Sequence, residues 1–150
     1  MRINLKMKKL FQNKQNLILL GIITIIVIGT AMFFSFKGVV TKQDWDSLQI
    51  GMSIQKIEKR IGKPKKVETD HSNIYDNVYS EYEKMYDLNS IVSDNSLEKR
   101  MERLNDISNA IDANKNVKEY TYIEKGPSGK RNVQVYFVNG AARYFNREKQ

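Results

Sequence analysis

The feature that most constrains this chain is an uncharged run of twenty residues at 17–36, LILLGIITIIVIGTAMFFSF. At about 1.5 Å of rise per residue, a helix of that length covers the roughly 30 Å apolar core of a bilayer. Residues 1–16 carry five Lys or Arg and no acid, so the positive-inside bias predicts that they form a cytoplasmic basic tail. The run therefore predicts a transmembrane helix at 17–36, followed by an extracytoplasmic domain over 37–150.

A cleaved signal peptide is the alternative interpretation of the same run. The basic segment before it and the small residues Gly29, Thr30 and Ala31 are typical of such peptides, and cleavage there would release a secreted protein. A signal-peptide core is about 7–15 apolar residues long, however, whereas this run continues to Phe36. The length favours an uncleaved anchor and a single-pass protein of the cell membrane, with its N-terminus in the cytoplasm.

The net charge of the chain is unevenly distributed along the sequence. The formal net charge is +8, but residues 1–37 hold six Lys or Arg and no acid. Residues 38–150 hold the remaining 19 of the 25 basic residues against all 17 acids, a balance of only +2. A nucleic-acid partner is therefore not expected. Because the chain has no cysteine, no disulfide holds the domain, and its apolar core must do so.

Two short helices are predicted between residues 41 and 64, and both begin in the same way. Thr41 is the expected N-cap of the first, with Asp44 completing a capping box. Ser53 is the expected N-cap of the second, which ends at Gly62. In each helix an apolar residue before the cap is expected to pack on one in the first turn, as a hydrophobic staple. The two staple pairs are Val40 with Trp45 and Met52 with Ile57.

A longer helical segment is predicted over 74–114. Four tyrosines recur at intervals of four, three and four residues, which places them on one helix face. After a break, where Ser96 is the expected N-cap, apolar residues continue the pattern. We expect a helical hairpin whose tyrosines form a core-facing seam, the alternative being a ligand or partner surface. The tyrosines are Tyr75, Tyr79, Tyr82 and Tyr86, and the second set is Leu97, Met101, Leu104, Ile107 and Ile111.

After residue 115 the apolar pattern changes to a period of two, which predicts an antiparallel sheet. Asn139-Gly140 predicts a tight hairpin turn between its last two strands, which places Tyr136 opposite Arg143. The predicted strands are 117–124, 132–138 and 141–146.

The two faces of this sheet are expected to differ in what covers them. One face is expected to lie beneath the two short helices. The other carries an apolar group that either binds a partner or is covered by the helical hairpin, and the hairpin is favoured because the tyrosines would otherwise also be unpacked. The candidate partner surface consists of Tyr136, Val138, Arg143 and Phe145.

Four short motifs follow one another along the domain: LQIGMS at 48–53, IGKP at 61–64, YTY at 120–122 and VQVYFVNG at 133–140. Together they resemble the SmpA/BamE-like domain, to which the beta-lactamase-inhibitor-protein-like domains are similar. The resemblance implies two helices packed on a three-stranded antiparallel sheet, in a small extracytoplasmic domain that binds other proteins and has no catalytic centre. The chain departs from the family in its long segment 65–116 and in having no cysteine for lipid attachment.

No group of residues predicts a reaction. His71 is the only histidine, and without cysteine there is no expected metal site and no nucleophile–base pair. The loop at 126–130 contains glycine and lysine but lacks P-loop spacing. We therefore predict that the protein is not an enzyme and has no cofactor, no metal and no small-molecule substrate.

These observations predict an α+β fold: an N-terminal transmembrane helix, then two short helices packed on a three-stranded antiparallel sheet, with 74–114 as an inserted helical hairpin. The predicted function is a membrane-anchored protein-binding module of the bacterial cell envelope, with an envelope or exported protein as its partner. An inhibitor or immunity factor acting on an exported enzyme or toxin is the alternative. A third hypothesis is an enzyme that uses carboxylates between Asp76 and Asp112.

Overall fold

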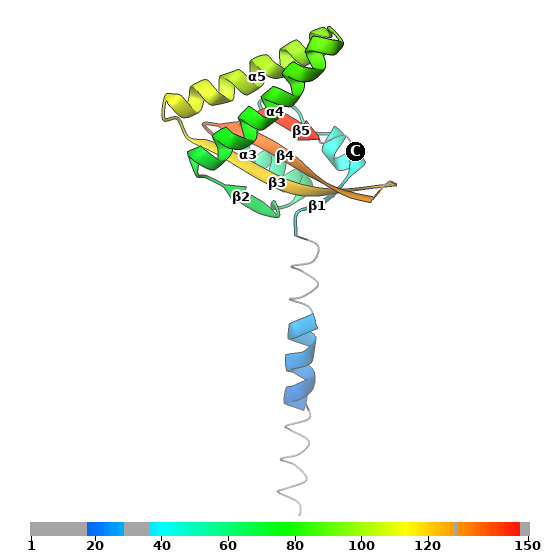
Figure 1. Ribbon diagram of the computed structural model, residues 1–150. Coiled ribbons are helices and arrows are strands. Elements are labelled where there is room, and N and C mark those ends of the chain that lie inside the picture. Colours follow the sequence, from blue (N-terminus) through cyan, green and yellow to red (C-terminus); the bar gives the residue numbers. More distant parts are fainter. Residues whose placement is uncertain (1–17, 29–36, 128, 148–150) are drawn as a thin grey trace, which may run out of the picture. The chain divides into compact units, whose positions relative to one another are not determined.

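The computed structural model describes residues 18–28, 37–127 and 129–147, and the chain divides into two units, Met1–Lys37 and Gly38–Gln150. In the first unit, residues 18–28 form a helix. The second unit is an α+β domain (Figure 1). Its elements are β1 (Val39–Thr41), α2 (Lys42–Asp46), α3 (Ile54–Ile61), β2 (Lys66–Glu68), α4 (His71–Ile91), α5 (Asn95–Asp112), β3 (Val117–Gly126), β4 (Gly129–Val138) and β5 (Ala141–Arg147).

The described part of the apolar run is shorter than the predicted membrane span. Among the described residues, no helix combines the length and the apolar character needed to cross a membrane. This finding contradicts the predicted transmembrane helix at 17–36 and, with it, the predicted signal anchor and single-pass location in the cell membrane. Residue 17, residues 29–36 with the alternative cleavage point, and the predicted tail 1–16 lie outside the described residues.

The sheet has five strands and is mixed, so the prediction of three antiparallel strands is wrong. β3 pairs with β4 along its whole length, and β4 pairs with β5, both antiparallel. The other edge of β3 holds two further strands, β1 in parallel and β2 antiparallel. Each is only three residues long, too short for a period of two to stand out in the sequence.

The predicted starts of the two short helices are confirmed. The backbone N–H of Asp44 donates to Thr41 Oγ1 at 3.1 Å, and Thr41 N–H donates to Asp44 Oδ2 at 3.2 Å, which completes the capping box of α2. In α3, the N–H of Lys56 donates to Ser53 Oγ at 3.3 Å. The apolar residues of both staple pairs lie together in one core. These caps fix where α2 and α3 begin and therefore how they reach the sheet.

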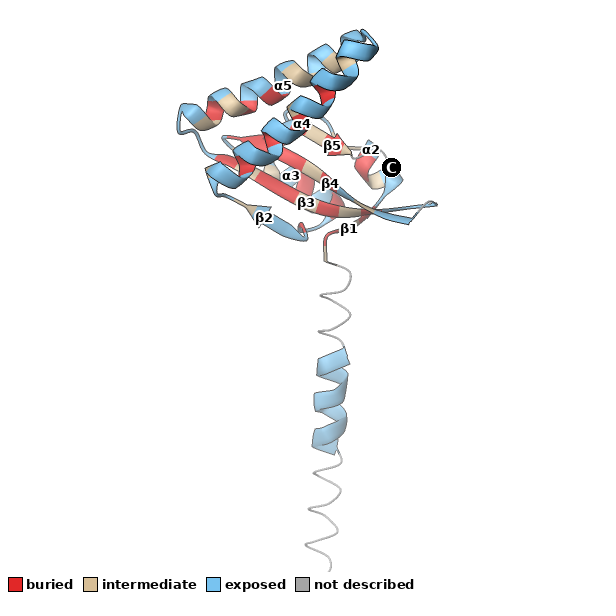
Figure 2. Ribbon diagram, viewed as in Figure 1, coloured by how far each residue is buried: buried red, intermediate tan, exposed pale blue. Residues whose placement is uncertain are grey.

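The sheet separates two cores, and Figure 2 shows the buried residues concentrated along the strands and the inner sides of the helices. α2 and α3 cover one face, and the α4–α5 hairpin covers the other, which confirms the favoured expectation for the second face. The first core contains Val40, Trp45, Met52, Ile57, Ile61, Tyr120, Tyr122, Val133, Val135, Phe137 and Ala142. The second core contains Ile74, Val78, Met85, Leu104, Ile107, Ala110, Val117, Tyr136, Val138 and Tyr144.

The hairpin begins its second helix earlier than expected. The N-cap of α5 is Asp94, whose Oδ1 accepts a hydrogen bond from the N–H of Ser96 at 2.7 Å, so the prediction of Ser96 as the cap is wrong. Asp70 caps α4 in the same way, through the N–H of Ser72 at 2.8 Å. In both caps an Asp carboxylate accepts a hydrogen bond from the backbone N–H two residues further on. These bonds fix the N-terminal ends of the two helices that form the second layer.

The turn between β4 and β5 is confirmed, but the register beyond it is not. Asn139 and Gly140 both have positive φ, 52° and 79°, as a tight two-residue hairpin turn requires. β5 then has one extra residue, Arg143, because Phe137 pairs with Ala142 whereas Tyr136 pairs with Tyr144. This bulge reverses the faces of all β5 residues that follow it.

Candidate protein-interaction surface

The structure does not bring the four residues of the predicted partner surface together. Tyr136 and Val138 are 1% and 9% exposed in the second core, beneath the α4–α5 hairpin. Phe145 packs on the opposite face, where its ring lies edge-on to Trp45 at 5.8 Å. Arg143 is exposed at the bulge of β5. Because the bulge moves Phe145 to the other face, these side chains do not form one patch.

The exposed aromatic surface lies instead on the outer side of α4. Tyr75, Tyr79 and Tyr86 are 39%, 53% and 58% exposed, and Tyr82 is half-buried, so the prediction of a core-facing tyrosine seam is wrong. We call these four residues the tyrosine face. Each buried residue of α4 directly precedes one of these tyrosines, so the buried set repeats with the same intervals of four, three and four residues. It consists of Ile74, Val78, Glu81 and Met85.

The tyrosine face is ordered as two stacked pairs. The rings of Tyr75 and Tyr79 are 6.3 Å apart with 10° between their planes. Those of Tyr82 and Tyr86 are 6.5 Å apart with 16° between their planes. Each pair joins residues four apart on the helix, where side chains of neighbouring turns meet. The four rings therefore form two nearly parallel pairs along one helix.

Acidic residues flank the tyrosine face. Asp76, Glu83 and Asp87 are all exposed, and at about 100° per residue they fall on the side of the tyrosines that is turned away from the core. The negative charge of Glu83 and a hydrogen bond to it raise the pKa of Tyr79. The Tyr79 hydroxyl is therefore protonated at neutral pH and can donate a hydrogen bond.

Three apolar side chains near the C-terminal end of α4 are exposed as well. Leu88, Ile91 and Val92 are 54%, 81% and 62% exposed at the tip of the hairpin. At about 100° per residue, Leu88 and Ile91 fall on the other side of the buried stripe from the tyrosines, so they do not belong to the tyrosine face.

Polar contacts beneath α4 hold the hairpin on the sheet. Asn77 Nδ2 donates to Glu119 Oε2 at 2.8 Å. Arg100 of α5 donates to the Tyr144 hydroxyl from Nε and Nη2, at 3.1 and 2.9 Å. Arg100 also lies 3.5 Å from Glu81. Burial raises the pKa of Tyr144 despite the opposing effect of Arg100, so its hydroxyl stays neutral. These contacts link α4 and α5 to β3 and β5.

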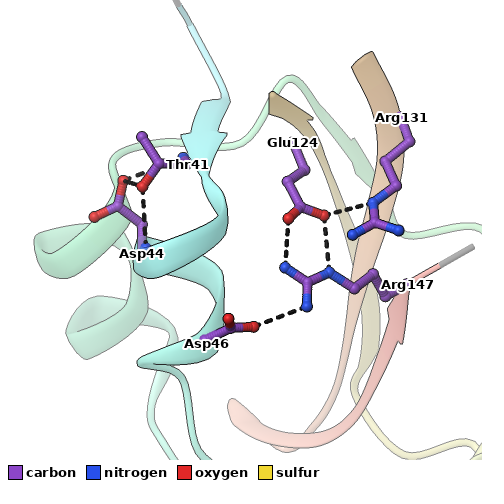
Figure 3. Close-up of polar contacts among 6 residues, drawn as sticks. All are labelled: Thr41, Asp44, Asp46, Glu124, Arg131 and Arg147. Carbon is purple, nitrogen blue, oxygen red and sulfur yellow. Dashed lines mark hydrogen bonds and ion pairs between the residues drawn. The ribbon is translucent and has the colours of Figure 1, made fainter. Parts of the chain in front are cut away.

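A second polar cluster lies at the opposite face of the sheet and joins the ends of three strands to α2 (Figure 3). Glu124 is 1% exposed and accepts hydrogen bonds from Arg131 Nε at 2.6 Å and from Arg147 Nε at 2.8 Å. Arg147 Nη2 also bonds Glu124, and Arg147 Nη1 donates to Asp46 at 2.8 Å. The hydrogen bonds from Arg147 and Arg131 outweigh burial and lower the pKa of Glu124 to about 2. A carboxylate held in this way is poorly suited to accept or donate a proton at neutral pH, so the cluster is a structural tie.

Residues that bind metals are dispersed in this fold. Among the described residues, no three His, Cys, Asp or Glu side chains are grouped so that they could hold a metal ion. His71, the only histidine of the chain, is the first residue of α4.

Comparison with known proteins does not assign the chain to a family. Neither a protein-family model nor a curated protein nor a solved structure matches the chain. The resemblance to the SmpA/BamE-like domain therefore stays a prediction, and the tyrosine face is the candidate site on structural grounds alone.

Proposed function

We propose that the domain at 38–150 is a non-catalytic protein-binding module and that the tyrosine face of α4 contacts its partner. One observation carries the proposal. A helix of 21 residues packs one side into the second core, while three exposed tyrosines and the half-buried Tyr82 form two stacked pairs beside it. A surface helix usually presents polar residues to water, so aromatic residues at these positions need a reason other than folding.

The chemistry of tyrosine supports this role. A tyrosine offers a large apolar ring and a hydroxyl, and it loses little rotamer freedom when bound, which is why tyrosine is enriched among the residues that dominate binding energy. In the tyrosine face, stacking already restricts Tyr75 against Tyr79 and Tyr82 against Tyr86. Pre-ordered side chains lower the entropic cost of association.

Site-specific photocrosslinking tests the proposal in the intact chain. We expect that a photoreactive phenylalanine analogue in place of Tyr79 or Tyr86 will form an adduct with one defined protein in the cells that produce this chain. The same analogue in place of Lys99, an exposed residue of α5, is the matched control and is expected to give no adduct.

Affinity for the protein identified in this way provides the second measurement. Replacement of Tyr79 and Tyr86 by Ala is expected to weaken binding at least tenfold, as for central interface residues. Because both side chains are exposed, the free energy of unfolding should change by less than about 0.5 kcal/mol for each. Unchanged affinity in both folded variants would show that the partner contacts another surface.

A further inference from the structure

A cleft of about 460 Å³ lies between α4 and α5, next to the end of β5 at Arg147. Its apolar lining comes from Met85 and Leu88 of α4 and from Leu97 of α5. Its charged lining consists of Glu81 and Lys84 from α4, Arg100 from α5 and Arg147 from β5. The cleft contains no residue of the tyrosine face and shares only Arg147 with the Glu124 cluster.

The charged residues of the cleft leave positive charge in excess. Arg100 lies 3.5 Å from Glu81, and its Nε and Nη2 donate to the Tyr144 hydroxyl, so it is held in place while 32% of its side chain stays exposed. Lys84 is exposed and forms no ion pair with any described residue. Arg147, the third cation of the lining, is paired with Asp46 and Glu124. Lys84 is therefore the cation of the cleft that no described carboxylate balances.

The walls of the cleft restrict what it can hold. They are the sides of two helices, whose backbone N–H and C=O groups are already bonded within each helix. An extended peptide would find no row of free backbone groups to pair with. A helix about 10–12 Å across would fill this volume with about one turn. The walls thus fit a single flexible apolar chain with one anionic end.

We propose that this cleft binds an aliphatic carboxylate, such as a fatty acid. The carboxylate lies between Lys84 and Arg100, and the alkyl chain packs on Met85, Leu88 and Leu97. Clefts of about 300–1,000 Å³ with a mostly apolar lining and a few polar groups are usual for small ligands. This assignment stands independently of the partner proposed for the tyrosine face, because it uses different residues of α4.

Titration of the full chain with sodium decanoate tests the proposal. We expect changes in the backbone amide NMR signals of residues 84–88 and 97–100, and saturation of these changes. Decanol, which has the same chain without the charge, and acetate, which has the charge without the chain, are expected to bind much more weakly. Dodecanoate should bind about tenfold more tightly than decanoate, since each buried methylene strengthens binding about fourfold at most.

Two surface variants connect the binding to this cleft. Lys84→Gln is expected to weaken decanoate binding about threefold to fivefold, as for a partly exposed ion pair. Lys99→Gln removes an equal charge outside the cleft and should leave the affinity unchanged. Leu88→Gln, at an exposed position, should also weaken binding without unfolding the protein. Equal binding of decanol and decanoate, signal changes confined to other residues, or unchanged affinity of Lys84→Gln would each overturn the proposal.

Discussion

Tyr136 lies opposite Tyr144 across β4 and β5, with their ring centroids 6.0 Å apart, although a regular hairpin from the Asn139-Gly140 turn would place Arg143 there. The single extra residue at Arg143 produces this pairing. It puts Tyr144 in the second core, where its hydroxyl accepts from Arg100, and it leaves Phe145 to the first. One bulged residue thus decides which aromatic side chain each core receives.

Deletion of Arg143 tests this explanation. Without it, Ala142 and Tyr144 become neighbours, and regular alternation still directs them to the first and second core. We expect the deletion variant to unfold cooperatively, with a loss of less than about 2 kcal/mol. Deletion of Thr121 from β3, where the pairing with β4 has no irregularity, is the control. It should prevent folding, because it moves half of the strand onto the wrong faces. Equal loss in both variants would contradict the role given to the bulge.

Glu124→Gln is expected to destabilise the fold by about 2–4 kcal/mol, measured by chemical denaturation. The reason is that Arg131 and Arg147, each 26% exposed, would lose the carboxylate that balances them. Asp46→Asn removes an acid from the same cluster at a side chain that is 49% exposed. That control should cost less than about 1 kcal/mol. If Glu124→Gln lowered the free energy of unfolding no more than Asp46→Asn does, the Glu124 cluster would contribute little to the stability of the fold.

The same carboxylate makes stability depend on pH. The pKa of Glu124 is lowered from 4.5 to about 2 in the folded chain, so its ionised form favours the folded state. The contribution is present in full above pH 4.5 and is lost as the pH falls towards 2, by roughly 3 kcal/mol at most. Denaturation of the wild type and of Glu124→Gln at several pH values measures it. The difference between them should shrink over this interval, and a difference independent of pH would contradict the lowered pKa.

Gly38→Ala should cost about 2 kcal/mol or more. Gly38 has φ +71°, and a Cβ there would lie 2.2 Å from the backbone nitrogen of Lys65. Gly51 has φ +85° with open space around it, so Gly51→Ala measures the backbone strain alone, about 1 kcal/mol. Thermal unfolding of both variants separates the two effects. If the melting temperatures of both variants fell equally, the close approach of Gly38 to Lys65 would not add to the loss of stability.

Features that a few adjacent residues determine could be predicted from the sequence. The Thr41–Asp44 capping box, the Ser53 cap and the Asn139-Gly140 turn depend on local hydrogen bonds and backbone angles, and all are present in the fold. Features that depend on a distant partner could not. β1 and β2 are strands only because β3 offers them an edge.

The tyrosine face was only the alternative to a core-facing seam, for a different reason. Two neighbouring stripes of α4, one beginning at Ile74 and the other at Tyr75, repeat with identical intervals, so periodicity alone does not tell which stripe is buried. The charged residue Glu81 in the first stripe argued against its burial, yet Arg100 and the second core accommodate it. The unusual number of tyrosines in the other stripe was the available clue.

The position of Trp45 gives the protein a built-in optical reporter. It is the only tryptophan of the chain, is 6% exposed, and lies edge-on to both Tyr122 and Phe145. Its emission should therefore be blue-shifted in the folded state and should follow the α2 side of the sheet. The exposed tyrosines of α4 lie on the other layer, so the fluorescence of Trp45 follows the first core separately from changes at the tyrosine face.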